Sequence, residues 1–159
     1  MGPHHVQGKH GERKLPICSK IGVEYFAIWQ GKGTGYGPFG TVVSDVVVVR
    51  RKAGKELGKC QVSVRPMKGG RHFGTISAGD DDWYLHRLAA WCFANPRNIS
   101  WKVFNQAGSS PRTKKWQAGH LSLNECDCRV KNLLVMTRKQ NLAMYKDVAL
   151  AKWGGVFKG

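Results

Sequence analysis

One histidine and two asparagines in the C-terminal half of the chain have side chains that could act together on a phosphate group. Asn132 follows His120 by 12 residues and Asn141 follows it by 21, in a segment too polar to be ordinary core. A neutral imidazole can take a proton from water, and an amide oxygen is a suitable ligand for a hard cation. Mg²⁺ binds readily with one protein ligand, several waters and a substrate phosphate. His120 is therefore a candidate general base, and Asn141 is a candidate ligand for Mg²⁺ or another divalent cation.

The helix that would carry Asn141 is the clearest element of the sequence. The run "TRKQNLAMYKDVALAKWGG" opens with Thr137 and Gln140 at the spacing of a capping box, in which each side chain binds the backbone N–H of the other residue. It closes with Gly154 and Gly155, and glycine is common just past the end of a helix. Asn141 is therefore expected in the first helical turns.

Two strands and a loop are expected before this helix. Residues 132–137, "NLLVMT", are strand-like, and the mostly polar segment 122–131, "SLNECDCRVK", is typical of a loop. His120 would then end the first strand, and Asn132 would tie the loop to the second strand through backbone hydrogen bonds. In this strand, loop, strand and helix unit, His120 and Asn141 would face each other across a small cleft.

The first half of the chain predicts a β-rich module. Between about residues 21 and 77, β-branched or aromatic runs alternate with glycine-containing turns, which indicates a small antiparallel sheet from "EYFAIWQ", "TVVSDVVVVRR", "CQVSVRP" and "HFGTIS". The run "GDDDWYLHRLAAWCFANP" then predicts a helix of about three turns that stops at Asn95-Pro96 and has an apolar face of Leu85, Leu88, Ala89 and Cys92. The segment from "NISWKVF" is expected to be a strand or a short extended piece. The fold class is therefore α+β.

The charge of the chain predicts a polyanionic partner. Lys and Arg number 26 against 10 Asp and Glu, a formal net charge of +16 that is spread along the chain. Nucleic acid is the first candidate because Lys and Arg release counterions when they neutralise phosphates, and an acidic membrane face is the weaker alternative. No apolar run approaches the length of a membrane span. The basic residues expected to contact nucleic acid are Arg129, Lys131, Arg138, Lys139, Lys114, Lys115, Arg50 and Arg51.

The cysteines predict a reducing, intracellular location and no zinc site. Five cysteines include no C-x-x-C pair, and no secretory apolar segment is found near the N-terminus. Cys126 and Cys128 could be half of a zinc site, but a structural site needs four ligands and no second pair stands at a workable spacing. The sequence does not predict the oligomeric state.

The residues around His120 resemble the HNH endonucleases of the His-Me finger (ββα-metal) superfamily. In that family a general-base histidine is followed 12 residues later by a structural asparagine in an Asn-Leu pair and 21 residues later by a metal-binding asparagine or histidine, as with Asn132-Leu133 and Asn141 here. Upstream, "LHRLAAWCFANP" is similar to the His-Arg-Leu-x-Ala-x-x-Phe-x-Asn-Pro segment of phage and intron-encoded homing endonucleases. The β-rich part is more loosely similar to the small DNA-binding module found before the finger.

The resemblance implies a metal-dependent DNA endonuclease of three parts. Residues 1–20 would be a basic flexible tail, residues 21–80 a β-rich nucleic-acid-binding module and residues 81–159 the finger domain. One position departs from the family: most members have Asp or His immediately before the base, and this chain has Gly119. The site would then lack one metal ligand, and the second hypothesis is a catalytically retired finger that binds nucleic acid within an RNA-protein assembly such as a ribosome. DNA is the favoured partner, and RNA remains the alternative.

Overall fold

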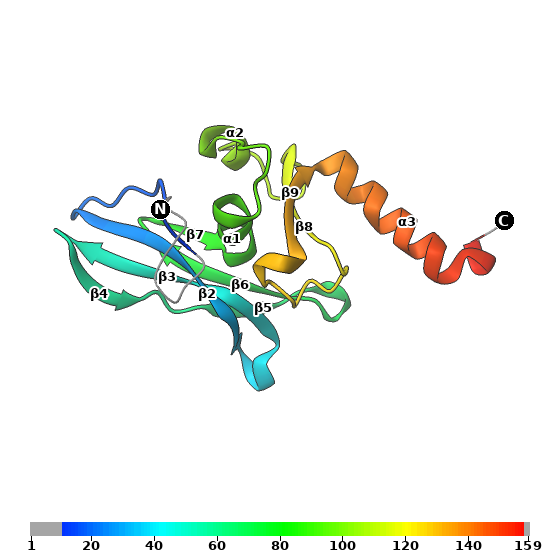
Figure 1. Cartoon of the computed structure of the whole chain (residues 1–159), viewed down its shortest axis with the longest axis horizontal. Coiled ribbons are helices and arrows are strands. Elements are labelled where there is room, and N and C mark those ends of the chain that lie inside the picture. Colours follow the sequence, from blue (N-terminus) through cyan, green and yellow to red (C-terminus); the bar gives the residue numbers. More distant parts are fainter. Residues whose placement is uncertain (1–10, 158–159) are drawn as a thin grey trace.

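The computed structural model describes the backbone of residues 11–157 and the side chains of residues 11–147. Within these residues the protein is a strand-rich α+β fold with three antiparallel sheets and three α-helices (Figure 1). The α+β class predicted from the sequence is confirmed. No helix in the described part is long and apolar enough to cross a membrane.

The first sheet contains four strands in chain order. Its strands are β1 (Gly11–Lys14), β2 (Val23–Tyr36), β3 (Val42–Lys52) and β4 (Lys55–Lys59). Strands β2 and β3 form a long hairpin whose register shifts between Trp29 and Thr34 and whose tip is the short 3-10 helix η1 (Pro38–Gly40). This tip extends away from the body of the molecule (Figure 1).

The second sheet and two helices follow. The sheet contains β5 (Ser63–Pro66), β6 (His72–Ala78) and β7 (Asp81–Tyr84), with the 3-10 helix η2 (Lys68–Gly70) between the first two strands. Helix α1 (Leu85–Phe93) begins directly after β7 and is followed by the short helix α2 (Trp101–Asn105).

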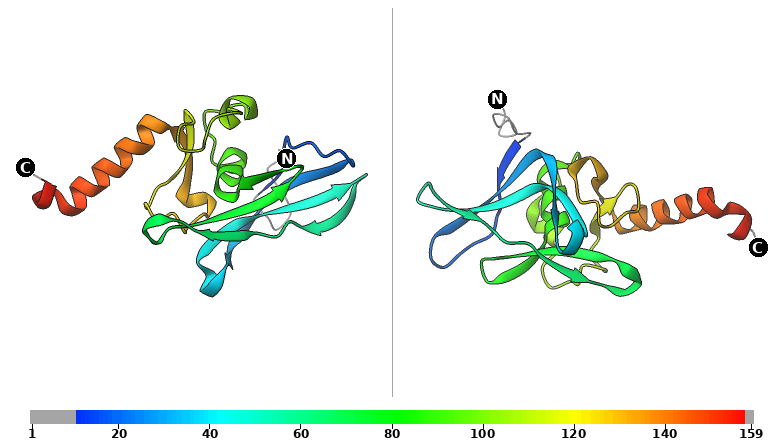
Figure 2. Two further views of the ribbon diagram at one scale, coloured as in Figure 1. Left: turned by 180° about the vertical axis from the view of Figure 1, so that it is seen from behind. Right: turned by 90° about the horizontal axis from the view of Figure 1, so that it is seen from below.

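The last sheet is a two-stranded hairpin that leads into the longest helix. It is formed by β8 (Trp116–His120) and β9 (Leu133–Thr137), with the 3-10 helix η3 (Val130–Asn132) just before β9. Helix α3 (Arg138–Phe157) starts immediately after β9 and projects away from the body (Figures 1 and 2). The strand, loop, strand and helix order expected from the sequence is therefore present.

Helix α1 lies at the centre of the core. Its predicted apolar face is buried against strands β2, β6, β8 and β9 and comprises Leu85, Leu88, Ala89 and Cys92. One cluster of buried side chains includes residues of the first sheet, of α1 and of the β8–β9 hairpin. The β-rich module and the finger domain proposed from the sequence thus share a core, which fixes the hairpin relative to the first sheet.

Three local predictions are corrected by the structure. Residues 11–17 are not part of a flexible tail, because β1 pairs with β2 and both Leu15 and Ile17 are buried; residues 1–10 lie outside the described part. The segment after Asn95-Pro96 is helical and not extended, since the Ser100 side chain caps α2 by accepting from Val103 N–H. The last helix does not end at the glycine pair but continues to Phe157.

Candidate functional site

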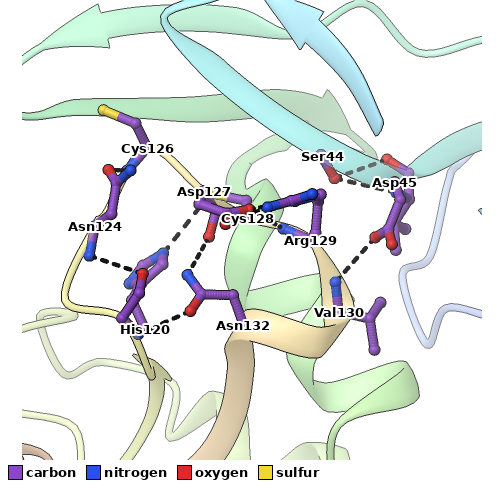
Figure 3. Close-up of polar contacts among 12 residues, drawn as sticks. Ser44, Asp45, His120, Asn124, Cys126, Asp127, Cys128, Arg129, Val130 and Asn132 are labelled. Carbon is purple, nitrogen blue, oxygen red and sulfur yellow. Dashed lines mark hydrogen bonds and ion pairs between the residues drawn. The ribbon is translucent and has the colours of Figure 1, made fainter. Parts of the chain in front are cut away.

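The loop between β8 and β9 is held in one conformation by Asn132. This side chain is only 6% exposed. Its Oδ1 accepts from Ser122 N–H at 2.8 Å, and its Nδ2 donates to the Asp127 carbonyl at 2.8 Å (Figure 3). The Asn132 carbonyl also accepts from Leu121 N–H at 2.8 Å. Asn132 therefore links the start and the end of the loop, which fixes the backbone directly after His120.

The same loop is bound to the first sheet. Val43 N–H donates to the Cys126 carbonyl at 2.8 Å, and Cys128 N–H donates to the Val43 carbonyl at 2.7 Å. The buried carboxylate of Asp45 accepts from Val130 N–H at 2.9 Å (Figure 3). Its other oxygen accepts from Trp29 Nε1 at 3.1 Å. A buried charge is stable only when it is hydrogen-bonded, so Asp45 fixes the position of the loop on β3.

His120, the last residue of β8, is 4% exposed and packs against α1. Its ring centroid lies 5.0 Å from that of His86, and its Nε2 lies 3.7 Å from Cys128 Sγ. Burial lowers the pKa of His120 below the ordinary imidazole value, although the negative charges of Glu125 and Asp127 act in the opposite direction. His120 is therefore neutral at pH 7, the form that can accept a proton.

The contacts of Cys128 favour one tautomer of His120. Burial raises the pKa of Cys128 to about 12, so its thiol keeps its hydrogen. The Sγ atom lies 3.5 Å from the Glu125 carbonyl, to which the thiol can donate. Sγ is then free to accept from Nε2–H of His120. This arrangement leaves Nδ1 of His120 without a proton, which makes it the nitrogen able to act as a base.

Asn141 lies in the first turns of α3 and faces the β8–β9 hairpin. The predicted capping box fixes this turn, since Thr137 N–H donates to Gln140 Oε1 at 3.0 Å and Gln140 N–H donates to Thr137 Oγ1 at 3.1 Å. Asn141 Nδ2 donates to Gln117 Oε1 at 3.3 Å. Its Oδ1 is buried and has no hydrogen-bond partner, so one acceptor in this turn is available to a ligand.

Gly119 makes the room that Asn141 occupies. A Cβ atom at this position would lie 2.6 Å from Met136 Cε and 3.1 Å from Asn141 Oδ1. Any larger residue would therefore require the Met136 side chain to move and would press on the Asn141 amide. The glycine brings the unpartnered oxygen of Asn141 directly against the β8 backbone.

His120 and Asn141 do not face each other across a cleft as the sequence predicted. Gly119 pairs with Leu134 and His120 with Leu133 in the hairpin, and consecutive strand residues point to opposite faces. Asn141 lies on the Gly119 face, whereas the His120 ring lies against α1. The structure thus places the two side chains on different faces of the end of β8.

Glu125 is a site residue that the sequence reasoning missed. Its side chain is 17% exposed, and its Oε1 accepts from the Tyr145 hydroxyl at 3.0 Å and pairs with Arg71 Nη1 at 3.5 Å. Burial, with the charge of Glu125, raises the pKa of Tyr145 to about 12. The other oxygen, Oε2, is buried without a hydrogen-bond partner. Tyr145, which binds Glu125, is one helical turn after Asn141, so the two residues lie on the same face of α3.

His86, on α1, also belongs to this region. Its ring stacks on Phe73 at 5.5 Å and contacts His120, and its Nδ1 is buried without a partner. Burial, followed by the charges of His120 and Arg87, lowers the pKa of His86 well below the ordinary value. Two neutral imidazoles therefore lie side by side under the loop. Among the described residues, no three His, Cys, Asp or Glu side chains are placed to hold a metal ion.

The basic residues predicted to contact nucleic acid have different environments. Lys131, Arg138, Lys139 and Lys115 are exposed beside the hairpin and the start of α3. Arg129 forms two hydrogen bonds of 2.8 Å with the Asp127 carboxylate.

The remaining three basic residues lie elsewhere. Arg50 is exposed at the far end of β3, and Arg51 beside it is paired with Glu12 at 2.7 Å. Lys114 is the exception to the prediction: it is 7% exposed, and its ammonium donates to the Asn105 and Gln106 carbonyls at the end of α2. Lys114 therefore stabilises the fold and is not available to a phosphate.

Searches of protein-family models, of curated proteins and of solved structures gave no significant match to this chain.

Proposed function

We propose that this protein is a metal-dependent endonuclease of the HNH type that hydrolyses phosphodiester bonds, with DNA as the favoured substrate. The observation that carries the proposal is the strand, loop, strand and helix unit in which Asn132 locks the loop and α3 presents an unpartnered Asn141 oxygen. This arrangement supports the resemblance found in the sequence, because His120 ends the first strand and Asn141 lies in the first turns of the helix, as expected. Asn132 lies in η3, directly before the second strand.

In this proposal His120 is the general base. Its neutral imidazole, with Nδ1 unprotonated, would take a proton from the water that attacks the phosphorus atom. The buried Cys128 thiol would hold the ring through Nε2 and so keep Nδ1 directed away from the loop. Because the ring is nearly covered, binding of the nucleic acid would have to open its Nδ1 edge to water.

Asn141 and Glu125 are the residues that we propose to hold a divalent cation such as Mg²⁺. Hard cations prefer oxygen ligands, and the Asn141 Oδ1 and Glu125 Oε2 atoms are buried oxygens without partners. When bound, the cation would neutralise the charge that develops on the scissile phosphate. Glu125 would then supply the second metal ligand, for which most HNH enzymes have Asp or His at the position of Gly119. Tyr145 and Arg71 would orient that carboxylate through its other oxygen.

The exposed lysines and arginines around the hairpin would position the substrate. Contacts from Lys131, Arg138 and Lys139 to phosphates fix the register of a bound strand but do not read its sequence. The net charge of +16 supports binding to either DNA or RNA.

A second candidate function is a retired finger that binds nucleic acid without cutting it, for example within an RNA-protein assembly. Two observations favour it. His120 is 4% exposed, and the position before it, Gly119, carries no side chain to bind a metal. In this alternative the hairpin and its loop would be retained as a binding scaffold.

Metal binding and cleavage measured on the same preparation test the proposal. Supercoiled plasmid should be cut in the presence of Mg²⁺ and left intact with EDTA. Asn141→Ala and Glu125→Gln should weaken Mn²⁺ binding, followed by electron paramagnetic resonance, and higher metal concentration should restore part of the cleavage. Glu24→Gln is the matched control, because Glu24 lies on β2 and not in the β8–β9 hairpin or its loop, and it should change neither metal binding nor cleavage. Tight nucleic-acid binding without cleavage of DNA or RNA in Mg²⁺, Mn²⁺ or Ca²⁺ would support the scaffold instead.

A further inference from the structure

The tip of the β2–β3 hairpin presents one aromatic side chain entirely to solvent. Phe39, in the middle of η1, is 107% exposed, more than any other large apolar residue of the described part. The tip extends beyond the sheets and away from the core (Figures 1 and 2). The ring therefore gains nothing from burial in this chain, although burial is what normally makes a phenylalanine favourable.

The backbone at Phe39 is also unfavourable for this residue type. Its φ of 55° and ψ of 26° lie in the left-handed region, where a bulky side chain is a genuine outlier and glycine has no steric cost. Gly37 and Gly40 on either side show that the hairpin uses glycine where φ is positive. A strained residue that contributes nothing to the core is evidence for a function of its side chain.

Hydrogen bonds order the backbone of the tip that carries Phe39. Gly40 N–H donates to the Gly37 carbonyl at 3.1 Å, and Thr41 Oγ1 donates to the Tyr36 carbonyl at 3.4 Å. The tip also packs against β5, because a Cβ atom at Gly37 would lie 3.0 Å from Val64 Cβ. The aromatic ring is thus carried on an ordered turn, which reduces the entropy lost when it binds a partner.

The charges around the hairpin indicate what this ring would meet. No acidic residue occurs between Glu24 and Asp45, and Lys32 is exposed on the hairpin. The Arg129 side chain packs against the hairpin, with its Cδ atom 3.4 Å from the place of a Cβ on Gly33, and its guanidinium is paired with Asp127. This arginine comes from the loop that follows His120, so the hairpin contacts the loop of the candidate site. A projecting aromatic ring in a segment without acidic residues, on a chain of net charge +16, suits a nucleic acid, because every base has a flat face for stacking.

We propose that Phe39 is a stacking wedge that contacts an unpaired or unstacked nucleobase of the nucleic acid bound at the candidate site. The inference rests on the proposed binding of nucleic acid but not on its cleavage. Stacking of one base on an aromatic side chain contributes on the order of 5- to 150-fold in affinity. The preferred substrate would be single-stranded or locally distorted, because an intact duplex offers no free base face.

The experiment compares Phe39→Gly and Phe39→Asn with the wild-type protein. Affinity would be measured by fluorescence anisotropy for three oligonucleotides: single-stranded DNA, a duplex with one bulged 2-aminopurine, and the fully paired duplex. Both variants should bind the first two probes about fivefold or more weakly and the paired duplex almost normally. They should also lose the 2-aminopurine quenching that the wild-type protein produces. Phe39→Trp should retain both properties.

Stability separates this role from a structural one. Glycine and asparagine tolerate a positive φ, so the melting temperatures of both variants should equal or exceed that of the wild-type protein. Ile21→Ala is the matched control, because Ile21 is an exposed apolar side chain in a turn outside the hairpin, and it should leave all three affinities unchanged.

Three results would overturn the inference. The first is that Phe39→Gly binds all three probes as tightly as the wild-type protein. The second is that the variant loses only its binding to vesicles of anionic lipid, which would make the ring a membrane anchor. The third is loss of self-association in sedimentation with unchanged DNA affinity, which would make it a contact between copies of the chain. Failure to cleave DNA, with binding and quenching intact, would refute the nuclease and leave the wedge in place.

Discussion

Replacement of Asn132 by alanine should destabilise the whole protein, because this amide joins both ends of the β8–β9 loop. The variant removes two side-chain hydrogen bonds of 2.8 Å and leaves Ser122 N–H and the Asp127 carbonyl without their partner. Each lost bond of this kind costs about 0.5–1.5 kcal/mol, so the unfolding free energy should fall by about 1–3 kcal/mol. For a domain of this size, that corresponds to a decrease in melting temperature of about 2–12 °C.

Asn124→Ala in the same loop is the matched control. Asn124 is exposed, and its side chain makes one hydrogen bond, accepting from Cys126 N–H at 3.1 Å. Its replacement should change the unfolding free energy by less than about 0.5 kcal/mol. Urea unfolding monitored by tryptophan fluorescence would measure both variants. Equal stabilities for Asn132→Ala and Asn124→Ala would refute the conclusion that Asn132 locks the loop.

Three further predictions concern charge and protonation. Burial lowers the pKa values of His86 and His120, so the folded state binds protons less readily than the unfolded state. The free energy of unfolding should therefore be highest above the unfolded pKa of about 6.5 and should decrease as the pH drops below that value, by up to about 1.4 kcal/mol per pH unit per histidine. Urea unfolding between pH 5 and 7 would measure this slope, which should be smaller in His86→Phe. Affinity for duplex DNA should decrease about a thousandfold between about 50 and 200 mM salt if about six phosphates are neutralised, and a flat response in anisotropy titrations would exclude a polyanionic partner. Lys114→Ala should lower the melting temperature without weakening DNA binding. Replacement of the exposed Lys131 by alanine should weaken DNA binding without lowering the melting temperature.

The sequence predicted best those elements whose signals are local. The capping box of Thr137 and Gln140 forms as expected, because its two hydrogen bonds depend only on residues three positions apart. The apolar face of α1 was likewise visible as a periodic pattern. Helix α2 was missed because its five residues include a β-branched and two aromatic side chains, and the Ser100 cap outweighs their strand preference.

Features that depend on contacts between distant segments could not be predicted from the sequence. Asp45 lies within an apolar run, and it is buried where Trp29 and Val130 from other segments donate to it. Lys114 was assigned to the surface by its charge, and only the packing of α2 reveals the carbonyls that bind it. The unpartnered oxygen of Glu125 follows from the docking of the loop on β3, which no short-range pattern encodes.

The rate of metal-dependent cleavage by His120→Ala tests the central claim most directly. If His120 is the base, this variant should cut plasmid DNA at least about 100-fold more slowly than the wild-type protein, and no concentration of Mg²⁺ should restore the rate. Its affinity for DNA should stay within about twofold, because a neutral imidazole adds little to phosphate binding. His72→Ala, on β6, is the matched control and should cut normally. Cleavage by His120→Ala at the wild-type rate, or no cleavage by a wild-type protein that binds DNA tightly, would contradict the account.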